Sequence, residues 1–89
     1  MKRIKLSEPV WDRIVTVNDS SNITELSFKA RDENIGEMRV SFANGNEYLY
    51  SPVKAFDFGI LAGSFSIGST FQKYLKLGII PLGERIVNE

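Results

Sequence analysis

Residues 38–52 read MRVSFANGNEYLYSP, and this stretch decides the fold. Apolar and polar residues alternate from Met38 to Phe42, which is typical of a strand with one buried face. Asn44-Gly45 is a strong signal for a hairpin turn. Glu47 to Tyr50 forms the returning strand, so the stretch predicts an antiparallel β-hairpin.

The length of the turn decides which face of the sheet carries Tyr48 and Tyr50. A two-residue turn pairs the tyrosines with residues of the polar face, Ser41 and Arg39. A three-residue turn with a bulge pairs them with residues of the core face, Val40 and Met38. We favour the core face, because buried aromatics are the commoner use of such residues. On the polar face, the tyrosines would form a stacking platform for bases beside Arg39.

Downstream of the hairpin, the sequence predicts a first short helix that opens at Ser51-Pro52. Serine is a favoured N-cap and proline suits the first helical position. The apolar stripe of this helix is formed by Val53, Phe56 and Ile60, with Ala55, Phe58 and Ala62 beside it. Gly63 is a natural end for the helix.

A second helix is predicted from about Thr70 to Leu77. Ser69 and Gln72 have the spacing of a capping box at its start. Gly78 ends it, because glycine is the usual residue just past a helix C-terminus.

The segments that flank this central part admit more than one interpretation. Ile23 to Phe28 has the composition of another strand. Before it, a short strand is predicted around Ile4 and Leu6. The next segment is either a helix that starts at Ser7-Glu8-Pro9, with Val10, Trp11 and Ile14 on one face, or a strand from Trp11 to Val17. The fold class predicted from all segments is α+β, a small antiparallel β-sheet packed against two short α-helices.

The C-terminal tail is too apolar to be left free in water. Its apolar residues are Ile79, Ile80, Leu82, Ile86 and Val87. We expect them to build part of a homo-oligomer interface, most simply that of a two-fold dimer. The alternative is that the tail folds back as an extra strand on its own sheet.

Composition narrows the function classes. The chain has 89 residues, which predicts one domain spanning 1–89. Lys+Arg and Asp+Glu both number 11, so the formal net charge is zero and binding to long DNA or RNA through the phosphate backbone is disfavoured. No leader pattern and no apolar run of about 18 residues is present, so we expect a cytoplasmic protein with no membrane partner.

Two missing residue types argue against catalysis. The chain has no cysteine, which excludes disulfides and thiolate metal sites. It has no histidine, the commonest general base and metal ligand. No phosphate-binding loop or dinucleotide fingerprint is found either. We therefore expect a protein that is not an enzyme and that needs no cofactor.

The order and spacing of the predicted elements resemble the KTSC family over residues 17–77, with an N-terminal extension at 1–16 and an apolar tail at 78–89. The matching positions are Val17, Ser20-Ser21-Asn22-Ile23, Leu26, Phe28, Val40, Phe42, Gly45, Tyr48, Tyr50, Val53, Phe58, Leu61, Ser66, Gly68, Phe71 and Leu75. The chain departs from the family pattern at two places. The Val-Pro pair expected before the helix is reordered as Pro52-Val53, and Ser64 stands where an alanine is expected.

The resemblance implies little about function. The KTSC family is named for a segment at the C-terminus of some lysyl-tRNA synthetases, and it also occurs as a stand-alone protein in bacteria and phages. It has no established activity, although RNA binding has been suggested for it.

The hydroxyl-rich segment before the second helix is the strongest candidate binding site. It contains Ser64, Ser66, Gly68, Ser69 and Thr70. Free N–H groups at a helix start attract anions, and hydroxyls add donors. Lys73 follows about one turn later, so the segment could cradle a phosphate. The alternative is ordinary capping and a tight turn between helices.

These observations predict a non-enzymatic binding module for RNA or a small nucleotide. The alternative is a protein-interaction module, such as a small phage-type inhibitor of a host protein or a sequesterer of a nucleotide signal. An enzyme is the least favoured class.

Overall fold

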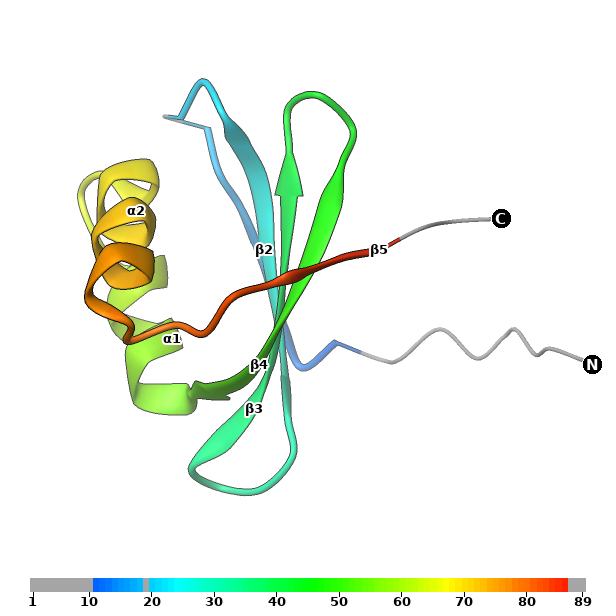
Figure 1. The fold of residues 1–89 in the computed structure, drawn as a ribbon, viewed down its shortest axis with the longest axis vertical. Helices are drawn as coiled ribbons and strands as arrows, with labels where there is room; N and C mark the ends of the chain where they lie inside the picture. The colour runs from blue at the N-terminus through cyan, green and yellow to red at the C-terminus, as the bar shows by residue number, and fades with distance from the viewer. Residues whose placement is uncertain (1–10, 19, 87–89) are drawn as a thin grey trace, which may run out of the picture.

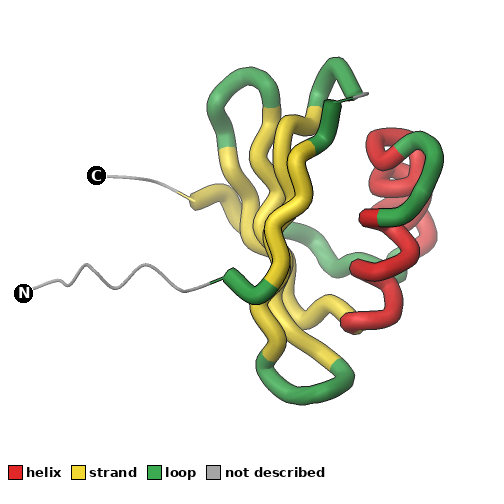
Figure 2. The backbone as a smooth tube through the Cα atoms, turned by 180° about the vertical axis from the view of Figure 1, so that it is seen from behind, coloured by secondary structure: helices red, strands yellow, loops and turns green. Residues whose placement is uncertain are grey.

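A computed structural model of the chain describes residues 11–18 and 20–86. The elements in chain order are β1 (Arg13–Thr16), β2 (Ile23–Ala30), β3 (Ile35–Phe42), β4 (Glu47–Lys54), α1 (Ala55–Ala62), α2 (Ile67–Leu77) and β5 (Glu84–Ile86). The five strands form one antiparallel sheet in the order β1-β2-β3-β4-β5. Both helices pack on the same face of the sheet (Figure 1 and Figure 2). The predicted α+β class is confirmed.

The β3–β4 hairpin has the three-residue turn. The N–H of Phe42 donates to the carbonyl of Asn46 at 2.9 Å, and Gly45 between them has a φ of +93°, which glycine adopts without strain. Tyr48 is therefore paired with Val40, and Tyr50 with Met38. The prediction that the two tyrosines lie on the core face is confirmed: Tyr50 is buried and Tyr48 is half-buried.

The core lies between the inner face of the sheet and the two helices. The sheet contributes Leu26, Phe28, Met38 and Val40, and the helices contribute Phe58, Leu61, Ile67 and Phe71. The rings of Phe28 and Phe58 stack with their centroids 4.9 Å apart. Burial of such side chains stabilises a fold by roughly 1.5–3 kcal/mol each, so this cluster is the main source of stability.

The first helix begins later than predicted. Ser51 and Pro52 belong to β4, which continues to Lys54 before α1 starts at Ala55. The strand continues because β3 begins early enough to pair with it to its end. Pro52 is tolerated because the β3–β4 register shifts there, and a proline within a sheet is accommodated at such a bulge.

The later start also changes which face of α1 is buried. Phe58 and Leu61 face the core, whereas Phe56 is 74% exposed and Ile60 is 44% exposed. Val53 is buried, but as a strand residue. The predicted stripe of Val53, Phe56 and Ile60 is therefore wrong, because it assumed that all three residues belong to one helix.

The second helix begins earlier than predicted. Its N-cap is Ser66, whose side chain accepts a hydrogen bond from the N–H of Ser69 at 3.4 Å, so the predicted capping box at Ser69 and Gln72 is wrong. Ile67 is buried, and its burial fixes the start of the helix against the core. Gly78 ends α2 in the left-handed conformation with a φ of 77°, as expected.

The N-terminal segment is a strand where the structure describes it. β1 pairs with β2 along its full length, so the helical alternative through Ile14 is wrong and the strand alternative is right. The predicted strand around Ile4 and Leu6 lies outside the described residues.

The C-terminal tail folds back onto its own sheet. Ile80 is buried, and β5 pairs with β4, with Ile86 opposite Glu47. A side chain at Gly83 would collide with the ring of Tyr50, so this glycine lets the tail cross that ring. The intramolecular alternative is thus the observed one, while Leu82 stays exposed and Val87 lies outside the described residues.

Candidate functional site

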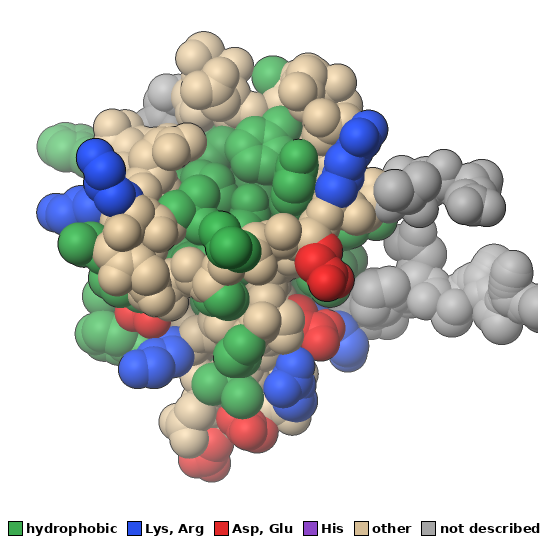
Figure 3. Space-filling model, in the orientation of Figure 1, with side chains coloured by type: hydrophobic (Ala, Val, Ile, Leu, Met, Phe, Trp, Pro, Cys, Tyr) green, Lys and Arg blue, Asp and Glu red, His purple; other side chains and the backbone are tan. Residues whose placement is uncertain are grey.

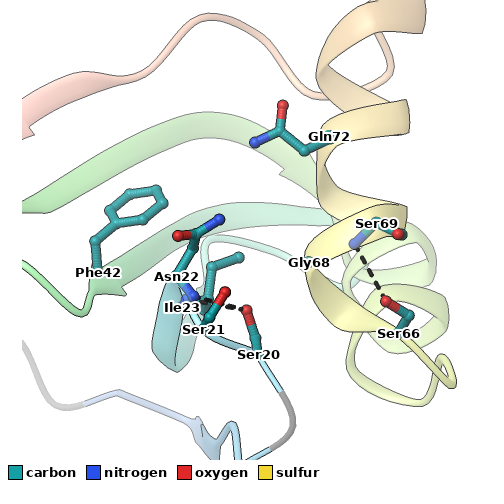
Figure 4. A pocket seen from close by; sticks show the side chains of 9 residues that line it. All are labelled: Ser20, Ser21, Asn22, Ile23, Phe42, Ser66, Gly68, Ser69 and Gln72. Carbon is teal, nitrogen blue, oxygen red and sulfur yellow. Dashed lines mark hydrogen bonds between the residues drawn. The ribbon is translucent and has the colours of Figure 1, made fainter.

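A polar cleft of about 400 Å³ lies between the start of β2 and the first turns of α2. Its lining residues are Ser20, Ser21, Asn22, Ile23, Phe42, Ser66, Gly68, Ser69 and Gln72. Figure 4 shows the serines before β2 facing the start of α2, with Phe42 at the opposite side and the Gln72 amide reaching from the helix toward the sheet. The cleft thus brings together two segments that lie far apart in the sequence.

The turn before β2 is held by the side chain of Ser20. Its hydroxyl oxygen accepts hydrogen bonds from the N–H groups of Asn22 and Ile23 at 3.2 and 3.1 Å. Ile23 is buried and anchors the turn to the core. Ser21 and Asn22 are exposed as a result, and their polar side chains are free to face the cleft.

The start of α2 supplies the opposite wall. The N–H groups of Ile67 and Gly68 have no acceptor within the helix, because the first turn of any helix lacks one. A Cβ at Gly68 would lie 3.2 Å from the Ser20 hydroxyl oxygen, so glycine is what allows the two walls to approach. Among the described residues, no lysine or arginine lines this cleft.

Next to the polar cleft, an aromatic hollow of about 270 Å³ lies between α2 and the β3–β4 hairpin. The hollow is lined by Phe42, Asn44, Asn46, Tyr48, Tyr50, Phe71, Gln72 and Leu75. Phe42 and Gln72 line both spaces and mark their junction. Figure 3 shows hydrophobic side chains gathered in this hollow, bordered by backbone and other side chains and, at one edge, by a basic side chain.

The aromatic rings in the hollow are packed against one another. Phe42 and Tyr48 meet nearly at right angles with centroids 5.6 Å apart, and Tyr50 meets Phe71 in the same way at 5.4 Å. Tyr50 and Phe71 are buried, whereas Phe42 and Tyr48 are half-buried and form the accessible surface. Burial raises the pKa of the Tyr50 hydroxyl above its ordinary value, and nearby Tyr48 shifts it in the same direction.

The structure places the predicted site residues in different parts of the molecule. Ser66, Gly68 and Ser69 line the polar cleft, and Tyr48 and Tyr50 line the aromatic hollow.

Four predicted residues line neither space: Ser64, Thr70, Lys73 and Arg39. The Ser64 hydroxyl donates to the carbonyl of Leu61 at 3.0 Å, so it caps the end of α1. Thr70 lies inside the first turn of α2, because the helix starts early, and is not among the lining residues. Lys73 borders a separate depression of about 570 Å³ with Lys76 further along α2.

Arg39 lies on the opposite face of the sheet. Its guanidinium donates to Glu25 at 3.1 Å and to the hydroxyl of Ser27 at 3.0 Å, and it covers the ring of Trp11 at 4.9 Å. The three-residue turn explains this position, because it turns the tyrosines and Arg39 to different faces. Arg39 is therefore a structural residue of the open face and does not reach the cleft.

Sequence reasoning missed Phe42 and Gln72, the two residues that join the cleft to the hollow. Phe42 was assigned to the core because it continues the alternation of β3. Its position beside the turn, at the end of the strand, is the available signal that α2 would cover it only in part. Gln72 stands out in the sequence only as part of a capping box, which does not indicate contact with a ligand.

Comparisons with known proteins do not identify a family for this chain. A scan against protein-family models, a search of curated proteins and a search of solved structures each found no match. The described residues contain no group of three or more Asp and Glu side chains arranged to hold a metal ion. No helix in the described part of the chain has the length and apolar character needed to cross a membrane.

Proposed function

We propose that this protein is a non-enzymatic binding module of the KTSC type for RNA or a small nucleotide. The observation that carries the proposal is the junction of a polar cleft with an aromatic hollow at Phe42 and Gln72. A nucleotide has the same two parts, an anionic phosphate and a flat aromatic base. A cytoplasmic location, where RNA and nucleotides are abundant, belongs to the same proposal.

The polar cleft suits a phosphate of low charge. N–H groups at the start of α2 and the hydroxyls of Ser21 and Ser69 are donors that phosphate oxygens accept. Because no lysine or arginine lines the cleft in the described part of the chain, these dipoles must hold the anion alone. We therefore expect a phosphodiester or monophosphate to bind at least as well as a triphosphate.

The proposal is tested by titrating the protein with a short single-stranded RNA, AMP and ATP while its amide signals are followed by NMR. We expect signals of Ser21, Gly68 and Ser69 to move, and affinity to fall as salt rises. Gly68→Val should weaken binding, because its side chain meets Ser20. Gly59→Val is the matched control, since a Cβ at Gly59 meets open space. Binding that leaves the cleft signals unmoved, or that is equal in both variants, would contradict the proposal.

Absence of catalysis is part of the proposal. We expect homogeneous protein to leave nucleotides and RNA intact over long incubation, because the chain contains neither His nor Cys. Turnover that a single substitution in the cleft abolishes would show that the protein is an enzyme.

A second candidate function is association with a protein, either a second copy of this chain or a host protein that a phage-type inhibitor would bind. Its support is the apolar surface left exposed on the helices, by Phe56 and Ile60 on α1 and by Leu77 at the end of α2. Light scattering at high micromolar concentration tests self-association. We expect Phe56→Ser with Ile60→Ser to convert an oligomer to a monomer, and a monomeric wild-type protein would contradict the homo-oligomer.

A further inference from the structure

We infer that the aromatic hollow is a subsite for a single nucleobase, with Phe42 and Tyr48 contacting the flat ring and Gln72 reading its edge. This inference rests on the proposed function, in which the polar cleft takes the phosphate of the same ligand. It adds the chemical class of the group that enters the hollow and the residues that recognise it.

The first support is the exposure of two aromatic rings that the fold could have covered. Phe42 and Tyr48 lie on the core face of the sheet, yet both are only half-buried. Accessible aromatic surface inside a concavity is typical of ligand sites, whereas scattered apolar residues on a convex surface are not. The hollow is therefore a place where a flat apolar ring can replace water.

The second support is the shape of the accessible surface. The planes of Phe42 and Tyr48 are 89° apart, so the two rings form a corner. A flat ring in this corner has its face against one side chain and its edge against the other, and both contacts are favourable for aromatic rings. At about 270 Å³, the hollow is just below the usual size of a small-molecule site, which suits one base and not a stack of bases.

The third support is the kind of polar group around the rings. Gln72 offers two donors and one acceptor at the junction with the polar cleft. The Asn44 side-chain oxygen accepts from the N–H of Asn46 at 3.0 Å, which fixes the Asn44 amide. The edges of bases carry both donors and acceptors, so amides match them better than charged groups. No Asp, Glu, Lys or Arg is among the described residues that line the hollow.

An NMR titration with parts of a nucleotide tests the inference separately from the proposed function. Adenosine and cytidine carry a base without phosphate, and ribose 5-phosphate carries phosphate without a base. We expect the nucleosides to shift the ring signals of Phe42 and Tyr48 and the side-chain amide of Gln72. Ribose 5-phosphate should shift the amides of Gly68 and Ser69 instead.

Substitutions then identify the groups that hold the base. Phe42→Leu keeps an apolar side chain but removes the ring, so it should weaken nucleoside binding about tenfold or more, while Phe42→Tyr should preserve it. Gln72→Met should reduce the difference in affinity between adenosine and cytidine. Tyr74→Leu removes a half-buried ring that does not line the hollow and is the matched control. Denaturant unfolding of each variant confirms that it is folded.

The outcomes separate the two ideas. If ribose 5-phosphate binds at the cleft but nucleosides leave the hollow unperturbed, the base subsite is overturned and the proposed function stands. Nucleoside binding at the hollow that Phe42→Leu abolishes supports the subsite, even where ribose 5-phosphate fails to bind. Equal loss of nucleoside affinity in Phe42→Leu and Tyr74→Leu would overturn the assignment of Phe42.

Discussion

The two ends of the interface between sheet and helices use aromatic residues in different ways. At the closed end, Phe28 and Phe58 stack and are almost completely buried. At the open end, Phe42 and Tyr48 belong to the same sheet but are only partly buried beside the middle of α2. A domain of this size has little core to spare, so aromatic surface left open lowers its stability. The difference indicates that one end stabilises the fold and the other is kept accessible.

The largest expected effect is at the closed end. Phe58→Ala should destabilise the protein by roughly 3–5 kcal/mol, because it removes a fully buried ring and leaves a cavity. Phe42→Ala should cost less, about 1–2 kcal/mol, since the Phe42 side chain is only partly buried at the edge of the core. Both are measured by denaturant unfolding. Equal costs would show that Phe42 belongs to the core, and the comparison between the two ends would fail.

Gly83→Ala is expected to have the next largest effect. Its methyl group would collide with the ring of Tyr50, so either the ring or the tail must move, at a cost of about 1–3 kcal/mol. Because Tyr50 forms the floor of the aromatic hollow, we also expect nucleoside affinity to fall. Thermal unfolding and the NMR titration measure the two effects. An unchanged melting temperature would mean that the tail does not cross Tyr50 as described.

Gly59→Ala should have a smaller effect of opposite sign. Gly59 lies within α1, where alanine is favoured over glycine by up to about 1 kcal/mol, and a Cβ there meets open space. We expect a slightly more stable protein whose ligand affinity is unchanged, because α1 covers the closed end only. A loss of affinity in this variant would show that the two ends are coupled.

The smallest expected effect is confined to alkaline solution. Burial raises the pKa of Tyr50 above its ordinary value of 10.0, so the folded protein holds this proton more tightly than the unfolded chain does. Stability should therefore be complete below pH 10 and should fall as the pH rises through the folded pKa. Tyr50→Phe removes this dependence. Unfolding curves between pH 8 and about 11 measure it, and identical pH profiles for wild type and variant would rule it out.

The hairpin was predictable because its signals are local. Alternation from Met38 to Phe42 and the Asn44-Gly45 pair specify two strands and a turn without reference to the rest of the chain. The starts of the helices were not predictable, because the same residue types occur in several kinds of local structure. Ser51-Pro52 suits a helix start and also a bulged strand, and Ser66 and Ser69 are both good caps. Burial of Ile67, a tertiary effect, selects Ser66.

The candidate site was predictable only in part, for a related reason. Ser66, Gly68 and Ser69 were identified because hydroxyls and a glycine before a helix have a recognisable chemistry. The opposite wall, Ser20 to Asn22, consists of residue types that are common in any turn. Sequence patterns do not show which turn faces which helix, so the cleft and its connection to Phe42 required the structure.

The order of the strands has a consequence for the kinetics of folding. β1 to β4 are each paired with their neighbour in the chain, an arrangement of short sequence separations that favours fast folding. The cleft exists only when α2 is docked against the turn that precedes β2, and we expect this docking to follow formation of the sheet. A ligand that binds only the docked form should therefore slow unfolding and leave the folding rate nearly unchanged. In stopped-flow experiments, a bound nucleotide should lower the unfolding rate constant and so lengthen the lifetime of the native protein. The folding rate constant should stay nearly the same.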